Sequence, residues 1–212
     1  MLAGDAFGAS AEIATVVVPV AVYFLVLGLL NSRPHPQLLS GRLDFALLTA
    51  AISPLFAVPV LGYFGISLLS VATAVALLAL GIAMLAPKGR TWVVYNLQGS
   101  EARRAVAAAL RSIGLDFQAR PNGYCLADQQ GFVRISEFAP LRNASVRLDG
   151  GDADLARRFE RALGKVLKGY RVQTSPMAVS LLLVATAMLV APLTMMAHRV
   201  PEIVRLLTDL LQ

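Results

Sequence analysis

Four long apolar stretches constrain the fold of this chain more than any other feature of its sequence. A helix needs about 20 apolar residues to cross the roughly 30 Å hydrocarbon layer of a bilayer, and lipid offers backbone polar groups no other partner. None of the four stretches contains Asp, Glu, Lys, Arg or His. The sequence therefore predicts four transmembrane helices, at 13–30, 45–63, 66–86 and 177–197.

The composition agrees with a membrane protein. Hydrophobic residues make up 57% of the chain and charged residues only 15%, whereas a soluble domain carries about 25% charged residues. The first twelve residues carry Asp5 and Glu12 but no basic side chain, so 13–30 lacks the basic start of a signal peptide and is predicted to be retained. The single cysteine, Cys125, excludes an internal disulfide.

Basic residues near the predicted spans orient the chain. Short cytoplasmic loops are enriched in Lys and Arg, and the loop after the first span carries Arg33 and Arg42. We therefore expect a multi-pass protein of the cell inner membrane with both termini outside and the large basic segment in the cytoplasm. The high Ala and Arg content suggests a bacterial source. The residues expected at the headgroups are Arg33, Arg42, Lys88, Arg90 and Arg171.

Between the third and fourth spans the pattern changes from continuously apolar to amphipathic, which predicts a soluble domain over 88–174. It reads as α+β: a strand in "TWVVYNL", a helix capped by Ser100, a Pro121-Asn122-Gly123 turn between strands, and a second helix capped by Asp152. "YRVQT" is a candidate last strand. Helices on one face of a small antiparallel sheet in β-α-β-β-β-α order predict a ferredoxin-like layout.

The remaining segments complete the predicted organisation. Residues 1–87 form an N-terminal membrane region with three helices, and 175–212 hold the fourth helix and an amphipathic interfacial helix over 200–212. Asp44 is the expected N-cap of the 45–63 helix, which Pro54 and Pro59 are expected to kink.

Residues with catalytic or metal-binding chemistry are sparse. His35 lies between Pro34 and Pro36, but one histidine without further ligands on its side of the membrane does not make a metal site. Cys125 has no histidine in its domain to act as a base. We therefore expect no catalytic residue, no metal and no enzyme activity, and we expect the His35 segment to be an extended turn.

Small residues recur at helical spacing in each predicted span. Lipid tails are as apolar as leucine, so membrane helices associate by close packing, which small side chains permit. These seams predict contact within the chain or with a partner helix. They comprise Ala14, Ala21 and Gly28; Ala46, Ala50, Ser53 and Ala57; Ala72, Ala76, Ala79 and Ala83; and Ala187 and Ala191.

The segment from Lys88 to Arg171 holds fifteen of the 19 basic residues. Its arginines are scattered and no aromatic-rich RNA-binding signature accompanies them, so we expect anionic lipid or protein partners rather than nucleic acid. A bare apolar seam can hold a pigment, a quinone or a lipid, so the sequence leaves any cofactor open.

The leading hypothesis is a non-catalytic accessory, scaffold or assembly subunit of a bacterial inner-membrane complex, which can be a hetero- or a homo-oligomer. The alternative is a small transporter or channel, in which the helix broken by Pro54 and Pro59 forms the site and the domain regulates it.

Overall fold

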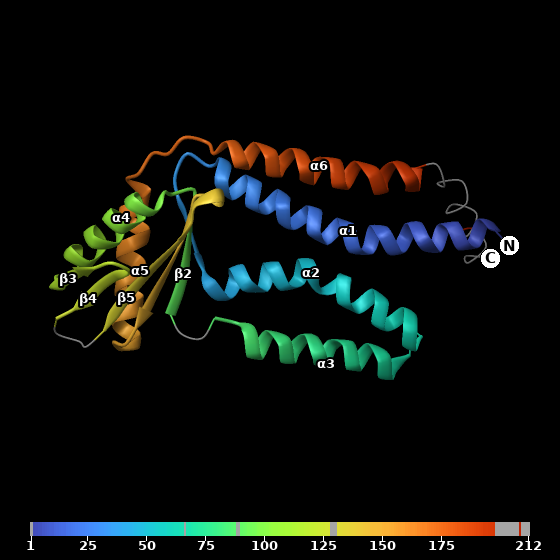
Figure 1. Cartoon of the computed structure of the whole chain (residues 1–212), viewed down its shortest axis with the longest axis horizontal. Coiled ribbons are helices and arrows are strands. Elements are labelled where there is room, and N and C mark those ends of the chain that lie inside the picture. Colours follow the sequence, from blue (N-terminus) through green and yellow to red (C-terminus); the bar gives the residue numbers. More distant parts are fainter. Residues whose placement is uncertain (1, 66, 88–89, 128–130, 198–207, 209–212) are drawn as a thin grey trace.

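The computed structural model describes residues 2–65, 67–87, 90–127, 131–197 and Thr208. Apolar helices extend from one side of a six-stranded sheet, and two amphipathic helices lie against that sheet (Figure 1). The elements are α1 Leu2–Ser32, β1 Gln37–Ser40, α2 Gly41–Phe64, α3 Leu68–Leu85, β2 Arg90–Tyr95, α4 Gly99–Ser112, β3 Phe117–Arg120, β4 Gly123–Leu126, β5 Phe132–Phe138, a 3-10 turn Ala139–Leu141, β6 Asn143–Asp149, α5 Ala153–Lys168 and α6 Pro176–Ala197.

Three helices are long and apolar enough to cross a membrane: Ile13–Ser32 within α1, Gly41–Phe64 and Leu68–Leu85. Helix α6 is also apolar, but its apolar stretch Pro176–Pro192 is shorter than these three, so the fourth span stays a prediction. The predicted amphipathic helix at 200–212 lies outside the described residues except for Thr208.

Helix α2 begins earlier than predicted. Strand β1 ends at Ser40, whose Oγ accepts a hydrogen bond from the backbone N–H of Leu43 and caps the helix. Asp44 is therefore not the N-cap: it lies in the first turn, with Arg42 inside the helix. At the other end Gly65 has φ +74°, and Ser67 and Ser70 form a capping box that starts α3. Helices α2 and α3 thus form a hairpin.

The sheet is antiparallel throughout, in the order β1-β2-β6-β5-β4-β3. Four consecutive strands, β3 to β6, lie between α4 and α5, so the predicted β-α-β-β-β-α order and its ferredoxin-like layout are wrong. Residues 170–174 form no strand. The sheet edge beside β2 is taken instead by β1, which comes from the loop after the first membrane helix.

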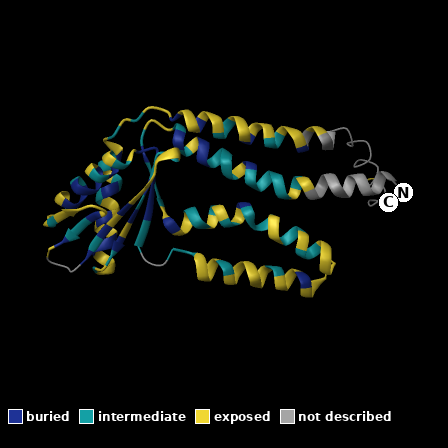
Figure 2. Ribbon diagram, in the orientation of Figure 1, coloured by how far each residue is buried: buried dark blue, intermediate teal, exposed yellow. Residues whose placement is uncertain are grey.

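Strand β2 is buried on both faces, which defines two cores (Figure 2). Trp92 and Val94 pack with α4 and α5 in the main core of the domain. Val93 and Tyr95 point to the opposite face and pack against Leu27 of α1 and neighbouring apolar side chains. Helices α4 and α5 therefore cover the sheet face that is turned away from the membrane helices (Figure 1).

The two amphipathic helices start differently. Oδ1 of Asp152 accepts a hydrogen bond from the N–H of Leu155 at 2.6 Å, as predicted for the N-cap of α5. Helix α4 begins at Gly99, one residue before the predicted Ser100 cap, and its N-cap Gln98 makes no side-chain cap bond. The carboxylate of Glu137 lies against Gly99 instead, where it complements the positive end of the helix dipole.

This difference predicts unequal effects of removing the two side chains. Asp152→Ala should lower the free energy of unfolding by about 1 kcal/mol, because it leaves an N–H of the first turn unpaired. Ser100→Ala, the matched control, should change it by less than about 0.5 kcal/mol. Urea unfolding followed by Trp92 fluorescence measures both, and equal losses would contradict the assignment of the caps.

Candidate functional site

The loop between α1 and α2 is part of the soluble domain. Its strand β1 pairs with β2 over four residues, from Gln37 opposite Tyr95 to Ser40 opposite Trp92. The loop and the domain therefore share one sheet. The common side of the membrane that their basic residues predict for the loop and the domain stays a prediction.

A tyrosine and a carboxylate connect the domain to the second membrane helix. Tyr95 of β2 is 2% exposed, and its Oη donates a hydrogen bond to Oδ1 of Asp44 in α2. Burial, and then the hydrogen bond and negative charge of Asp44, raise the pKa of Tyr95 above its usual value. The hydroxyl therefore stays protonated and keeps donating to Asp44 at neutral pH.

The raised pKa of Tyr95 predicts a loss of stability at alkaline pH. The pKa is higher in the folded than in the unfolded chain, where it is about 10, so the stabilisation is complete below that pH and declines as pH rises above it. The free energy of unfolding should therefore fall more steeply above pH about 10 in the wild type than in Tyr95→Phe. Urea unfolding of both proteins across this range tests it, and parallel curves would contradict it.

Two buried asparagines connect α1 with the end of β2. The backbone N–H of Asn96 donates to Oδ1 of Asn31 at 3.2 Å, and Nδ2 of Asn96 donates to the carbonyl of Arg33 at 2.9 Å. The N–H of Val172, in the linker before α6, donates to the carbonyl of Pro34 at 3.0 Å. The segments that leave α1 and enter α6 are thus joined to each other and to β2, and we call this region the junction.

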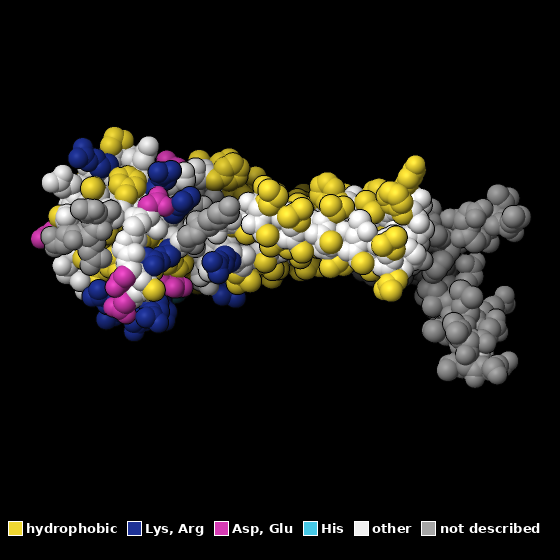
Figure 3. Space-filling model, turned by 90° about the horizontal axis from the view of Figure 1, so that it is seen from below, with side chains coloured by type: hydrophobic (Ala, Val, Ile, Leu, Met, Phe, Trp, Pro, Cys, Tyr) yellow, Lys and Arg dark blue, Asp and Glu magenta, His cyan; other side chains and the backbone are white. Residues whose placement is uncertain are grey.

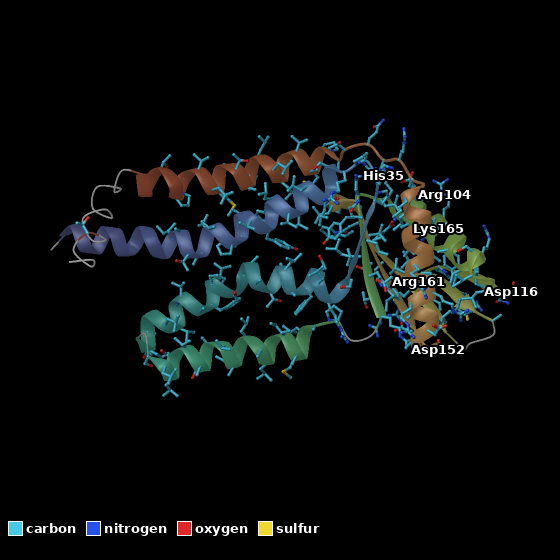
Figure 4. All side chains as sticks on the ribbon, turned by 180° about the vertical axis from the view of Figure 1, so that it is seen from behind. His35, Arg104, Asp116, Asp152, Arg161 and Lys165 are labelled. Atoms are coloured by element: carbon cyan, nitrogen blue, oxygen red, sulfur yellow. The ribbon has the colours of Figure 1, made fainter. Side chains whose placement is uncertain are left out.

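His35 and Cys125 lie in different places. His35 belongs to the junction (Figure 4), is half-buried, and its carbonyl accepts a hydrogen bond from Nε2 of Gln37 at 2.9 Å. Cys125 lies in β4, is half-buried, and alternates with Tyr124 and Leu126, which contact the main core. Among the described residues no three His, Cys, Asp or Glu side chains are grouped so that they could hold a metal ion.

Helix α5 presents a basic stripe on its outer face. The stripe follows helical spacing and all of its side chains are exposed; it consists of Arg157, Arg161, Lys165 and Lys168. Asp154 pairs with Arg157 at 3.8 Å and with Arg158 at 3.0 Å. Within the described ranges no carboxylate pairs with Arg161, Lys165 or Lys168. Figure 4 shows Arg161 and Lys165 on α5, beyond the sheet as seen from the membrane helices.

The residues expected at the headgroups differ in their contacts. Arg33 donates to Oε1 of Gln37 at 3.0 Å, and Arg90 donates to the carbonyls of Gly150 and Gly151 at 3.2 and 2.8 Å. Arg42 is exposed at the start of α2, Arg171 is exposed after α5, and Lys88 lies outside the described residues. Figure 3 shows basic side chains on the domain and an apolar surface along the helices.

The small-residue seams fall on both packed and open faces. Ala21 and Gly28 are buried where α1 meets α6, and a Cβ on Gly28 would lie 2.7 Å from Cγ of Leu182. On α6, Ala178 and Ala185 are also buried, each 0% exposed. The other seam residues are half-buried at Ala14, Ser53 and Ala57, and exposed at Ala46, Ala50, Ala72, Ala76, Ala79, Ala83, Ala187 and Ala191.

Comparisons with models of known protein families, with curated proteins and with solved structures find no match to this chain. The class of protein to which this chain belongs is therefore defined by its fold alone. The chain is a multi-pass membrane protein in which at least three apolar helices are joined to a mixed α/β domain with a six-stranded antiparallel sheet.

Proposed function

We propose that this chain is a non-catalytic accessory, scaffold or assembly subunit of a bacterial inner-membrane complex, and that its cytoplasmic domain docks a partner protein. The observation that carries the proposal is the basic stripe of α5, held at a fixed position relative to the membrane helices. In this proposal α6, which packs along α1, is the fourth span, so both termini lie outside.

The direct attachment of the domain to the membrane helices supports a docking role. The domain is joined to the membrane helices by the β1–β2 pairing, by the Tyr95–Asp44 hydrogen bond and by the apolar core around Val93. A domain held by flexible linkers would present its surface in many orientations. This one presents α5 in a single orientation, which lowers the entropic cost of binding a partner that is itself in the membrane complex.

The direction of the stripe favours a protein partner over the headgroups of the same membrane. Helices α4 and α5 cover the sheet face opposite to the membrane helices, so Arg161 and Lys165 point away from the nearest leaflet (Figures 1 and 4). The basic residue proposed to lie at headgroup level is Arg42, which is exposed at the start of α2. Lipid contact and protein docking are thus assigned to different surfaces.

Charge reversal on the stripe tests this proposal. The double variant Arg161→Glu/Lys165→Glu should weaken partner binding at least about tenfold, because it replaces attraction to an acidic surface by repulsion. The control Arg120→Glu/Arg134→Glu reverses the same charge on exposed residues of β3 and β5 and should retain the partner. Purification in mild detergent, with the mass of the complex measured, reads out both. A wild-type chain that purifies as a monomer without any co-purifying subunit would contradict the proposal.

The alternative of a transporter has less support. Pro54 and Pro59 do lie inside α2, as a broken transport helix would require. The surface beside them, however, is lined by apolar side chains of α2 and α3, which favour hydrocarbon over a polar solute. Solute flux in reconstituted vesicles that changes in Pro54→Ala and Pro59→Ala would favour transport.

A further inference from the structure

An open apolar groove of about 740 Å³ lies between helices α2 and α3. Its walls include Phe45, Ile52 and Val60 of α2, and Leu78, Gly81 and Leu85 of α3. The groove runs from the domain end of the hairpin toward the turn. In a bilayer it opens onto the hydrocarbon layer, because the two helices that form it are candidate membrane spans.

The groove offers no free hydrogen-bond donor to a ligand. Its two hydroxyl side chains already donate to their own helix: Thr49 Oγ1 donates to the carbonyl of Phe45 at 2.8 Å, and Ser53 Oγ donates to that of Ala50 at 2.9 Å. An occupant is therefore held by apolar contact alone. Lipid tails are as apolar as leucine, so an acyl chain fits a groove lined by such side chains.

The domain end of the groove carries a positive charge. Arg42 lies one helical turn before Phe45, on the neighbouring surface of α2, and is exposed. No hydrogen bond or ion pair engages its guanidinium within the described part of the chain. Asp44, two residues away, is oriented toward Tyr95 and accepts its hydrogen bond. Arg42 is therefore available to an anion at headgroup level.

We propose that the groove between α2 and α3 binds an anionic glycerophospholipid, with an acyl chain between the helices and the phosphate at Arg42. This inference goes beyond the docking function. It requires only that α2 and α3 lie in the membrane, and it places the lipid site on the opposite side of the sheet from the α5 stripe.

Two pairs of variants, each with a matched control, test the groove and the charge of Arg42 separately. Gly81 lines the groove with nothing within 4 Å of its Cβ position, so Gly81→Leu has room for its Cβ and adds an apolar side chain to the groove. Gly62 is also in a membrane helix with open space at its Cβ position but does not line the groove, so Gly62→Leu is the matched control. Arg42→Gln removes the charge, and Arg33→Gln is its control.

The test uses the full chain in phosphatidylcholine vesicles that contain phosphatidylglycerol or phosphatidylcholine with a photoactivatable acyl chain. Cross-linked lipid is located on residues 45–85 by mass spectrometry. In the wild type we expect about fivefold more cross-linking from phosphatidylglycerol, the preference that one well-placed basic residue provides. Arg42→Gln should abolish this preference and Arg33→Gln should keep it.

Filling the groove should have a separate effect. Gly81→Leu should reduce cross-linking by both lipids about threefold. Gly62→Leu should leave the cross-linking unchanged. Ala74→Leu, also in the groove, repeats the test if Gly81→Leu does not fold. Equal cross-linking by the two lipids in the wild type, or no effect of either filling variant, would overturn the proposal.

Discussion

Phe159→Ala should lower the free energy of unfolding of the domain by about 3–5 kcal/mol. Phe159 is 1% exposed in α5, and its ring packs edge-to-face on Trp92 of β2, with centroids 5.5 Å apart. Truncation leaves a cavity between the helix and the sheet, since the rest of the core cannot fill it. Because Phe159 fixes α5 to β2, the same variant should also weaken partner binding by the basic stripe.

Urea unfolding in detergent provides the measurement. Trp92 is the chain's one tryptophan and contacts Phe159, so its fluorescence reports this core directly. Phe138→Ala is the control: Phe138 is 55% exposed in β5, and its loss should cost less than about 0.5 kcal/mol. A Phe159→Ala protein that stayed within about 1 kcal/mol of the wild type would show that α5 is not held by this contact.

The membrane helices and most domain elements could be predicted from local pattern. A continuous apolar stretch needs only lipid around it, which is why three predicted spans correspond to α1, α2 and α3. The stretch "TWVVYNL" predicted β2, whose residues from Trp92 to Tyr95 are all buried. In these cases the residues that carry the signal are neighbours in sequence.

Strand β1 could not be predicted because its partner is distant. Only four residues long, it pairs with β2, more than 50 positions further on. Leu38 and Leu39 point to opposite faces, the first toward the main core and the second toward the membrane helices. Leu38 and Leu39 are the one sign of a strand in the loop sequence. They do not identify the strand with which β1 pairs.

The candidate site could be predicted only in part, because residues that are distant in sequence form it. Counting Lys and Arg located the basic charge in the domain, but which surface carries it depends on the sheet topology. That topology puts Arg161 on the sheet face turned away from the apolar helices and leaves Arg42 beside the groove. The sequence predicts Asp44 as an N-cap because the N–H groups nearest to it in sequence are those of the helix start. Its actual partner, Tyr95, is brought to it by the β1–β2 pairing.

Gly123→Ala should destabilise the domain by about 3 kcal/mol or more, combining backbone strain with a clash. Gly123 starts β4 at φ +149°, a conformation that L residues rarely adopt. A Cβ there would lie 1.8 Å from the carbonyl oxygen of Val133 in the neighbouring strand. Since this atom belongs to the backbone, relief requires β5 to move, and β5 lies at the centre of the sheet between β4 and β6.

Gly114→Ala separates the two contributions. Gly114 also has positive φ, +73°, but nothing lies within 4 Å of its Cβ position, so only the conformational cost of about 1–2 kcal/mol remains. Urea unfolding followed by Trp92 fluorescence compares the variants. If Gly123→Ala lost no more stability than Gly114→Ala, the close approach of β4 and β5 would not be what selects glycine at position 123.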